Sequence, residues 1–96
     1  MRLEWHEDKE KANIRNHGLD FSLAQHVAND PLGVLVYDRY ENGEHRYHVI
    51  AMVGGTCLVL VHTYPDPEDE DWIRVIGLRV ATPHERKRYE EGRYDG

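Results

Sequence analysis

Apolar residues in the first third of the chain recur with helical spacing. Residues 7–16 are rich in helix formers and carry acids in the first turn, and Gly18 can close this helix in the left-handed conformation. A second helix is predicted over 21–29, opened either by Asp20 or by a Ser22–Gln25 capping box. Residues 2–5 precede these helices as a short predicted strand.

From Gly33 the apolar residues alternate with polar ones, which is typical of β-strands. Asn42-Gly43 and Gly54-Gly55 lie between the alternating runs, where tight hairpin turns belong. A last helix is predicted over 83–91, because Thr82 and Glu85 form a capping box and Pro83 suits the first helical position. The four strands are predicted near 33–39, 45–53, 57–64 and 72–80.

Short connections favour antiparallel neighbours, so the fold class is α+β. We expect a four-stranded antiparallel meander plus the short N-terminal strand, with two N-terminal helices and one C-terminal helix. A chain of 96 residues suits a single domain spanning 1–96. The predicted core residues are Trp5, Phe21, Val27, Val49, Val59, Ile73 and Val75.

Composition excludes several classes of protein. Cys57 is the single cysteine, so intramolecular disulfides and thiolate-rich zinc sites are excluded, and we expect it to be buried. The apolar runs are too short for a bilayer, and the N-terminus does not resemble a signal peptide. We therefore expect a cytoplasmic protein without membrane contact.

The net charge of −6 argues by itself against a general nucleic-acid binder, but the charges are unevenly distributed. Five acids lie in the stretch 66–71, which we expect to be an exposed loop, and the rest of the chain has a net charge of −1. Residues 72–89 contain five lysines or arginines against the single acid Glu85. The chain thus combines an acidic loop with a basic C-terminal third.

Three groups of residues, in register along the chain, resemble one known family. The first is Trp5–Lys9 with Asn13, His17-Gly18 and Phe21; the second is Asp30–Leu32, Asp38-Arg39 and Gly43–Tyr47; the third is Arg74–Thr82 with Glu85 and Tyr89-Glu90. They resemble the signature of BrnT-type toxins, from which the chain departs at His6, Asn16, Gly77 and Leu78.

The resemblance implies a RelE-like fold and an endoribonuclease that inhibits translation. It also implies a neutralising antitoxin of the BrnA type, a ribbon-helix-helix DNA binder, so that the toxin would contact operator DNA only through the antitoxin. The departures and the acidic balance favour an alternative function, a catalytically weak binding module that acts as a corepressor within the antitoxin complex. The residues leave the RNA target and any dependence on ribosomes open.

RNA is cleaved without a metal when its own 2′-hydroxyl attacks the adjacent phosphate, which requires a base, an acid and cations. His17, in a matched motif at a helix end, is the candidate proton carrier, although it could instead help to close the helix. Arg79 and Arg46 are the candidate phosphate ligands. Arg79 could instead form a salt bridge to the acidic loop, and Arg46 could instead pair with Glu44 or a neighbouring acid.

Lys9 is a further candidate cation, although lysines on a helix surface are usually only solvated. Glu85 could transfer a proton, but the capping box already accounts for it. The expected RNA-binding residues of the basic third are Arg74, Arg86, Lys87, Arg88 and Tyr89, of which Tyr89 could equally serve packing.

We expect no metal and no cofactor. The histidines other than His17 do not match metal-ligand spacing, and His45 and His48 should face opposite sides of a strand. The antitoxin is expected to cover the basic C-terminal third, where it would occlude the phosphate site.

Overall fold

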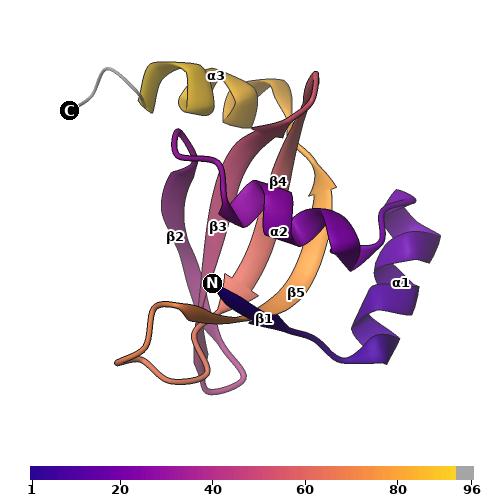
Figure 1. Cartoon of the computed structure of the whole chain (residues 1–96), viewed down its shortest axis with the longest axis vertical. Helices are drawn as coiled ribbons and strands as arrows, with labels where there is room; N and C mark the ends of the chain where they lie inside the picture. Colours follow the sequence, from indigo (N-terminus) through magenta and orange to yellow (C-terminus); the bar gives the residue numbers. More distant parts are fainter. Residues whose placement is uncertain (93–96) are drawn as a thin grey trace.

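A five-stranded sheet forms the centre of the computed structural model, which describes residues 1–92 (Figure 1). The strand order is β1-β5-β4-β3-β2, and every neighbouring pair is antiparallel except β1 and β5. The elements in chain order are β1 (Arg2–Glu4), α1 (Glu7–His17), the 3-10 helix η1 (Phe21–Leu23), α2 (Ala24–Ala28), β2 (Val34–Glu41), β3 (Glu44–Val53), β4 (Thr56–Thr63), β5 (Trp72–Val80) and α3 (Pro83–Gly92). This confirms the predicted α+β class, the antiparallel meander and the three helical regions.

The two predicted hairpin turns are confirmed by their backbone angles. Asn42 and Gly43 both have positive φ, 53° and 80°, and Gly54 has φ 60°. These angles suit the right-handed twist of a two-residue hairpin, and asparagine and glycine adopt them at low cost. Gly18 likewise closes α1 with φ 70°, and its N–H donates to Ile14.

The second predicted helix differs from the expectation in its first turn. Phe21–Leu23 form a 3-10 turn before α2, and the cap is Asp20, whose carboxylate accepts from the Ser22 backbone and hydroxyl. The alternative Ser22–Gln25 capping box does not form, because the Ser22 N–H donates to Asp20 and the Gln25 amide donates to Asn29. Asp20 thus satisfies the Ser22 N–H, and the carboxylate of Glu10 accepts from the Phe21 N–H.

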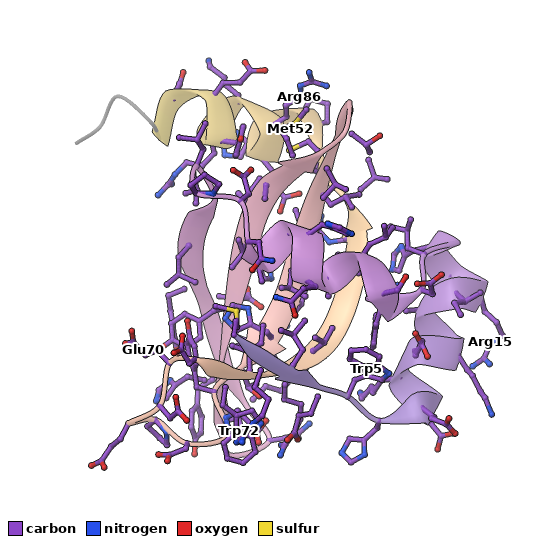
Figure 2. All side chains as sticks on the ribbon, in the orientation of Figure 1. Trp5, Arg15, Met52, Glu70, Trp72 and Arg86 are labelled. Carbon is purple, nitrogen blue, oxygen red and sulfur yellow. The ribbon has the colours of Figure 1, made fainter. Side chains whose placement is uncertain are left out.

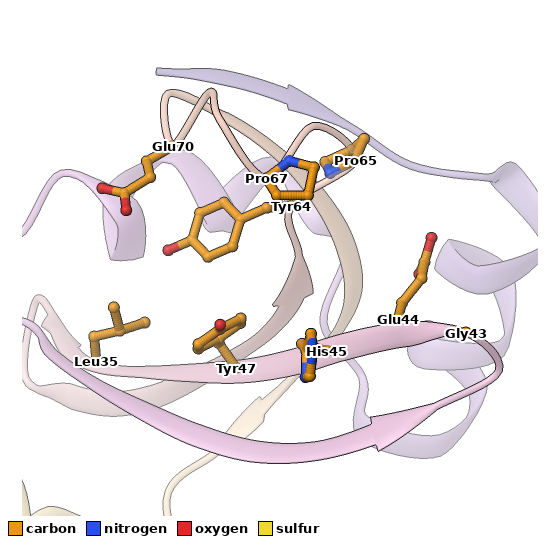
Figure 3. Close-up of a pocket in the computed structure, with 9 residues that line it drawn as sticks. All are labelled: Leu35, Gly43, Glu44, His45, Tyr47, Tyr64, Pro65, Pro67 and Glu70. Carbon is orange, nitrogen blue, oxygen red and sulfur yellow. The ribbon is translucent and has the colours of Figure 1, made fainter.

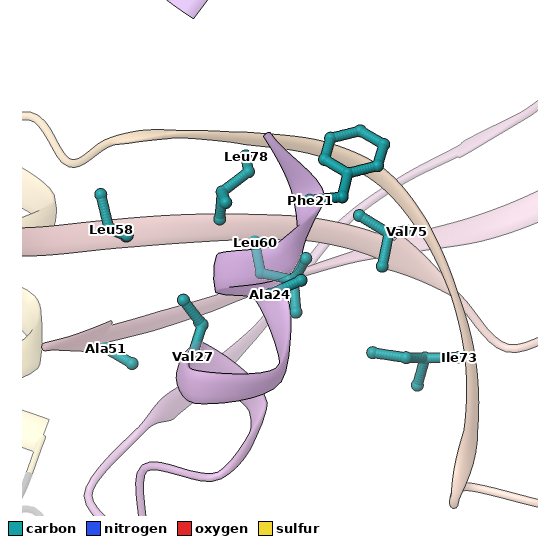
Figure 4. Close-up of a cluster of buried hydrophobic side chains, with 9 residues drawn as sticks. All are labelled: Phe21, Ala24, Val27, Ala51, Leu58, Leu60, Ile73, Val75 and Leu78. Carbon is teal, nitrogen blue, oxygen red and sulfur yellow. The ribbon is translucent and has the colours of Figure 1, made fainter. Parts of the chain in front are cut away.

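Helix α2 covers one face of the sheet and forms the main core (Figure 4). Phe21, Ala24 and Val27 pack on side chains from three adjacent strands, all within the buried cluster of Phe21, Ala24, Val27, Ala51, Leu58, Leu60, Ile73, Val75 and Leu78. Trp5 does not belong to this core: it is 38% exposed and contacts Phe21 edge-on, with ring centroids 5.8 Å apart. Figure 2 shows it beside α1, at the edge of the molecule.

Helix α1 packs beside the outer edge of β5, beyond the short strand β1 (Figure 1). β1 pairs with only the first half of β5, from Trp72 to Arg74. Farther along, Asn13 of α1 takes the place of a strand: Leu78 N–H donates to its Oδ1 at 3.0 Å, and its Nδ2 donates to the Leu78 carbonyl at 2.7 Å. A single side chain therefore completes the edge of β5.

Helix α3 covers one end of the opposite face. Tyr89 packs there in a second cluster with Ile50, Cys57 and Val59. Cys57 is buried, as predicted, and burial raises the pKa of its thiol. None of the helices within residues 1–92 combines the length and apolar character needed to cross a lipid bilayer.

Candidate functional site

The face of the sheet that α3 covers only in part carries most of the polar strand residues. Along β3, Glu44, Arg46 and His48 alternate to the same side as Ile50, which packs under α3. On β5, Arg79 lies opposite Val59 and Arg74 opposite Thr63, again on this side. We call this surface, defined by Arg46, His48, Thr63, Arg74 and Arg79, the arginine face.

Arg79 is held rigidly at the end of β5. Its Nη1 and Nη2 donate to the two carboxylate oxygens of Glu85 at 2.7 and 2.9 Å. The ion pair is therefore made with α3 and not with the acidic loop, which lies at the other end of β5. The Arg79 guanidinium lowers the pKa of the Glu85 carboxyl to about 2. The predicted capping box also forms, since Thr82 and Glu85 exchange hydrogen bonds of 3.0 and 3.2 Å.

Arg46 is half-buried on β3 and pairs with Glu41 at 2.7 Å, across the hairpin. This matches the expected pairing with a neighbouring acid. Its Nε is buried without a hydrogen-bond partner among the described residues, as is the Oγ1 of Thr63 on the same face. Buried polar atoms without partners are uncommon, and these two lie on the same face of the sheet.

His48 also belongs to this face, although sequence reasoning considered it only as a metal ligand. Its Nε2 lies 3.4 Å from Oδ2 of Asp38, and both side chains are about four-fifths buried. Asp38 reaches it because β2 is irregular between Tyr37 and Arg39, so that Asp38 has no partner residue on β3. His45 contacts Tyr37 and Tyr40 on the opposite face, which confirms that the two histidines point apart.

The strand register places His48 between the two arginines. Val59 pairs with Ile50 and Arg79, whereas Val61, two residues on, pairs with His48 and Gly77. Two residues of strand span about 7 Å, so His48 lies one such step from the row of Arg79 and one from Arg46. Because Gly77 has no side chain, no side chain of β5 rises above the sheet in the row of His48.

Arg74 is already committed to two carboxylates. Its Nε donates to Glu4 at 2.9 Å and its Nη1 to Glu44 at 3.0 Å, which joins β1, β5 and β3. Arg86 and Lys87 lie exposed on α3 and pair loosely with Glu90 and Glu91, at 3.3 and 3.9 Å. Arg88 is exposed on the same helix.

Tyr89 is buried to 6% exposure, and its hydroxyl donates to Asp30 at 2.9 Å. Asp30 also accepts the Met52 N–H, and these bonds tie α3 to the end of α2 and to β3. This placement favours the packing interpretation of Tyr89 over stacking on an RNA base.

Lys9 and His17 lie on α1, at the edge of the sheet, and both are exposed. Within residues 1–92 no hydrogen bond or ion pair joins either of them to Arg46 or Arg79. The structure thus places Arg46, Arg74 and Arg79 on the same face of the sheet. Lys9 and His17 lie apart from this face, on α1. The signal for His48 was available in the sequence: it lies two residues from Arg46, and residues at that spacing on a strand share a face.

No three His, Cys, Asp or Glu side chains of the described residues are grouped so that they could hold a metal ion. Since Arg74 already donates to two carboxylates, the arginine face offers the guanidinium groups of Arg46 and Arg79 and an imidazole oriented by a carboxylate. Such a set can bind a phosphate and transfer a proton.

Comparison with known proteins identifies one family for this chain. A search of curated proteins gave no match. The family model described as the ribonuclease toxin BrnT of type II toxin–antitoxin systems matches residues 5–85, which include every residue of the arginine face. Since this match covers most of the sequence and the α+β architecture is consistent with a RelE-like toxin, the chain belongs to the BrnT family of ribonuclease toxins.

Proposed function

We propose that this toxin cleaves single-stranded RNA without a metal ion, with the 2′-hydroxyl of the substrate as nucleophile. The observation that carries the proposal is the placement of Arg46, His48 and Arg79 on one open face of the sheet. The arginines would bind the scissile phosphate, and the strand register places the imidazole in the row between them.

In the proposed reaction the 2′-oxygen attacks phosphorus, the bond from phosphorus to the 5′-oxygen breaks, and the leaving 5′-oxygen takes a proton from a general acid, which gives a 2′,3′-cyclic phosphate and a 5′-hydroxyl. His48 takes the 2′-hydroxyl proton, and Asp38, 3.4 Å from its Nε2, orients the ring. Arg46 and Arg79 balance the additional negative charge of the transition state. Of the candidates from the sequence, His17 stays a proposal for the general acid and Lys9 a proposal for a further cation.

The test is incubation of the purified toxin with single-stranded RNA in the presence of a chelator. We expect cleavage, with a cyclic phosphate at the 3′ end of the upstream product. Arg79→Ala should lower the rate more than tenfold, equivalent to about 1.4 kcal/mol of transition-state stabilisation. Arg15→Ala is the matched control, since it removes an exposed arginine on α1, outside the arginine face and the basic C-terminal third. A wild-type protein inert toward RNA with and without ribosomes would overturn the proposal.

The two histidines are distinguished by their separate variants. We expect His48→Gln to abolish cleavage while binding of an uncleavable 2′-deoxy oligonucleotide persists, because the role assigned to His48 is proton transfer. Asp38→Asn should lower the rate less and shift its pH profile, whereas a purely structural Asp38 would change stability alone. If His17→Ala lost cleavage and His48→Gln kept it, the base would lie on α1 instead.

In the cell, we propose that the toxin acts in the cytoplasm, inhibits translation by cutting RNA, and is neutralised by a BrnA-like ribbon-helix-helix antitoxin. The antitoxin would cover the basic C-terminal third around Arg79 and would alone contact operator DNA. A structure of the complex in which Arg79 stayed open to solvent would contradict this mode of neutralisation.

One observation favours the second candidate function, a catalytically weak corepressor. Both arginines already have carboxylate partners, Glu85 and Glu41, so a phosphate must compete for them. Tight antitoxin binding and promoter repression by a protein inert toward RNA would support this alternative.

A further inference from the structure

A pocket of about 380 Å³ lies on the face of the sheet opposite the arginine face (Figure 3). Its floor is formed by Leu35 of β2 and by His45 and Tyr47 of β3. The segment that leads into the acidic loop, Tyr64 to Glu70, forms the other wall. Because His45 and Tyr47 alternate with Arg46 and His48, this pocket lies on the other side of the sheet from the proposed catalytic residues, and Glu44 at its rim is the lining residue that belongs to the side of Arg46.

Two tyrosine rings, Tyr47 and Tyr64, lie in the walls of the pocket. The Tyr47 and Tyr64 rings meet at 65° with centroids 5.1 Å apart, and Tyr47 also contacts Tyr37. Beyond the pocket, Tyr37 and Tyr40 are 52% and 62% exposed and both contact His45. Such a continuous exposed aromatic surface is characteristic of sites that bind a partner.

Carboxylates complete the pocket. Glu70 lies beside Tyr64 at one end of the pocket, on the side of Leu35, and Glu44 lies at the opposite end (Figure 3). Burial and the charge of Glu70 both raise the pKa of the Tyr64 hydroxyl. Four further acids, Asp66, Glu68, Asp69 and Asp71, lie exposed on the same loop. The surroundings attract cations and repel the phosphates of RNA.

We propose that this pocket receives an arginine side chain from a basic segment of a protein partner. A guanidinium stacks on tyrosine rings and pairs with a carboxylate through two parallel hydrogen bonds, so Tyr47, Tyr64 and Glu70 together match its shape and charge. The exposed rings of Tyr37 and Tyr40 would contact the neighbouring residues of that segment. The proposal is independent of RNA cleavage, since it uses the opposite face of the sheet.

The test is an NMR titration of the intact protein with a capped tri-arginine peptide, and with a tri-citrulline peptide that has the same shape without the charge. We expect the arginine peptide to shift the resonances of His45, Tyr47 and Tyr64, and the citrulline peptide to shift them weakly. Glu70→Gln should weaken binding about three- to fivefold, and Tyr64→Leu should do so by a similar factor.

Glu68→Gln is the matched control, because it removes the same charge from the same loop outside the pocket, and it should leave the affinity within about 1.5-fold. Equal losses for Glu68→Gln and Glu70→Gln would mean diffuse attraction to the loop and would overturn the proposal. So would pocket shifts with uridine monophosphate in place of the arginine peptide, which would indicate a nucleotide site.

Discussion

At the scale of single residues, Glu85 combines two structural roles. It completes the capping box of α3 with Thr82, and it clamps the guanidinium of Arg79 with both carboxylate oxygens. The first role could be predicted from the spacing Thr82-x-x-Glu85, but the second depends on where β5 ends. One carboxylate thereby sets both the start of α3 and the direction of a proposed phosphate ligand.

Replacing this carboxylate should lower stability in a pH-dependent way. Because the pKa of Glu85 is lowered from 4.5 to about 2 in the folded protein, its stabilising effect is complete above pH 4.5 and is lost as the pH falls toward 2. We expect Glu85→Gln to lower the free energy of unfolding by roughly 1–3 kcal/mol at pH 7. Urea unfolding at pH 7 and pH 3 measures this, and an equal deficit at both pH values would contradict it.

At the scale of elements, Asn13 joins α1 to the sheet. Its side chain is 6% exposed and makes two hydrogen bonds with the backbone of Leu78 and one with the Leu19 carbonyl. An asparagine suits this position because it both donates and accepts, as a neighbouring strand would. The presence of asparagine at this position is thus explained, because no strand within residues 1–92 pairs with the outer edge of β5 at Leu78.

Asn13→Ala should therefore destabilise the protein strongly, because it leaves the Leu78 N–H and carbonyl buried without partners. We expect a loss of roughly 2–4 kcal/mol in the free energy of unfolding. Asn16→Ala, an exposed change on the same helix, should stay within about 0.5 kcal/mol. Chemical denaturation of both variants is the measurement, and similar losses for the two would show that α1 is held by other contacts.

At the scale of the whole molecule, charge is separated along the sheet. The acidic loop lies at one end and α3, with Arg86, at the other (Figure 2). The predicted exposure of residues 66–71 is confirmed. Since the loop carries five of the acids behind the net charge of −6, it creates a field that opposes the approach of RNA to the arginine face.

Neutralising part of the loop should accelerate RNA cleavage at low salt. The triple change Asp66→Asn, Glu68→Gln and Asp69→Asn keeps Glu70 and the isosteric turn acceptors in place. We expect a faster initial rate at about 0.01 M ionic strength, where the Debye length is about 30 Å, and no difference at about 1 M, where it is about 3 Å. A gain that persisted at high salt would mean that the loop acts by direct contact.

By itself the sequence determined the elements of this protein. The alternation from Gly33, the turns at Asn42-Gly43 and Gly54-Gly55, and the Thr82–Glu85 capping box act over a few neighbouring residues, so the strands and α3 were predicted nearly to their observed bounds. The same local patterns could not show that β1 pairs with β5 in parallel, or that Trp5 lies at the edge of the core.

Only the tertiary structure decided which of these residues meet. Arg46 and Arg79, predicted separately from motifs, share a face with His48 because of the strand register, and the irregularity of β2 brings Asp38 to that histidine. Lys9 and His17 lie apart on α1, since Asn13 fixes that helix at the edge of β5. Local propensity depends on neighbours in sequence, whereas a phosphate site depends on side chains from strands more than thirty residues apart, which only the pairing of the sheet brings together.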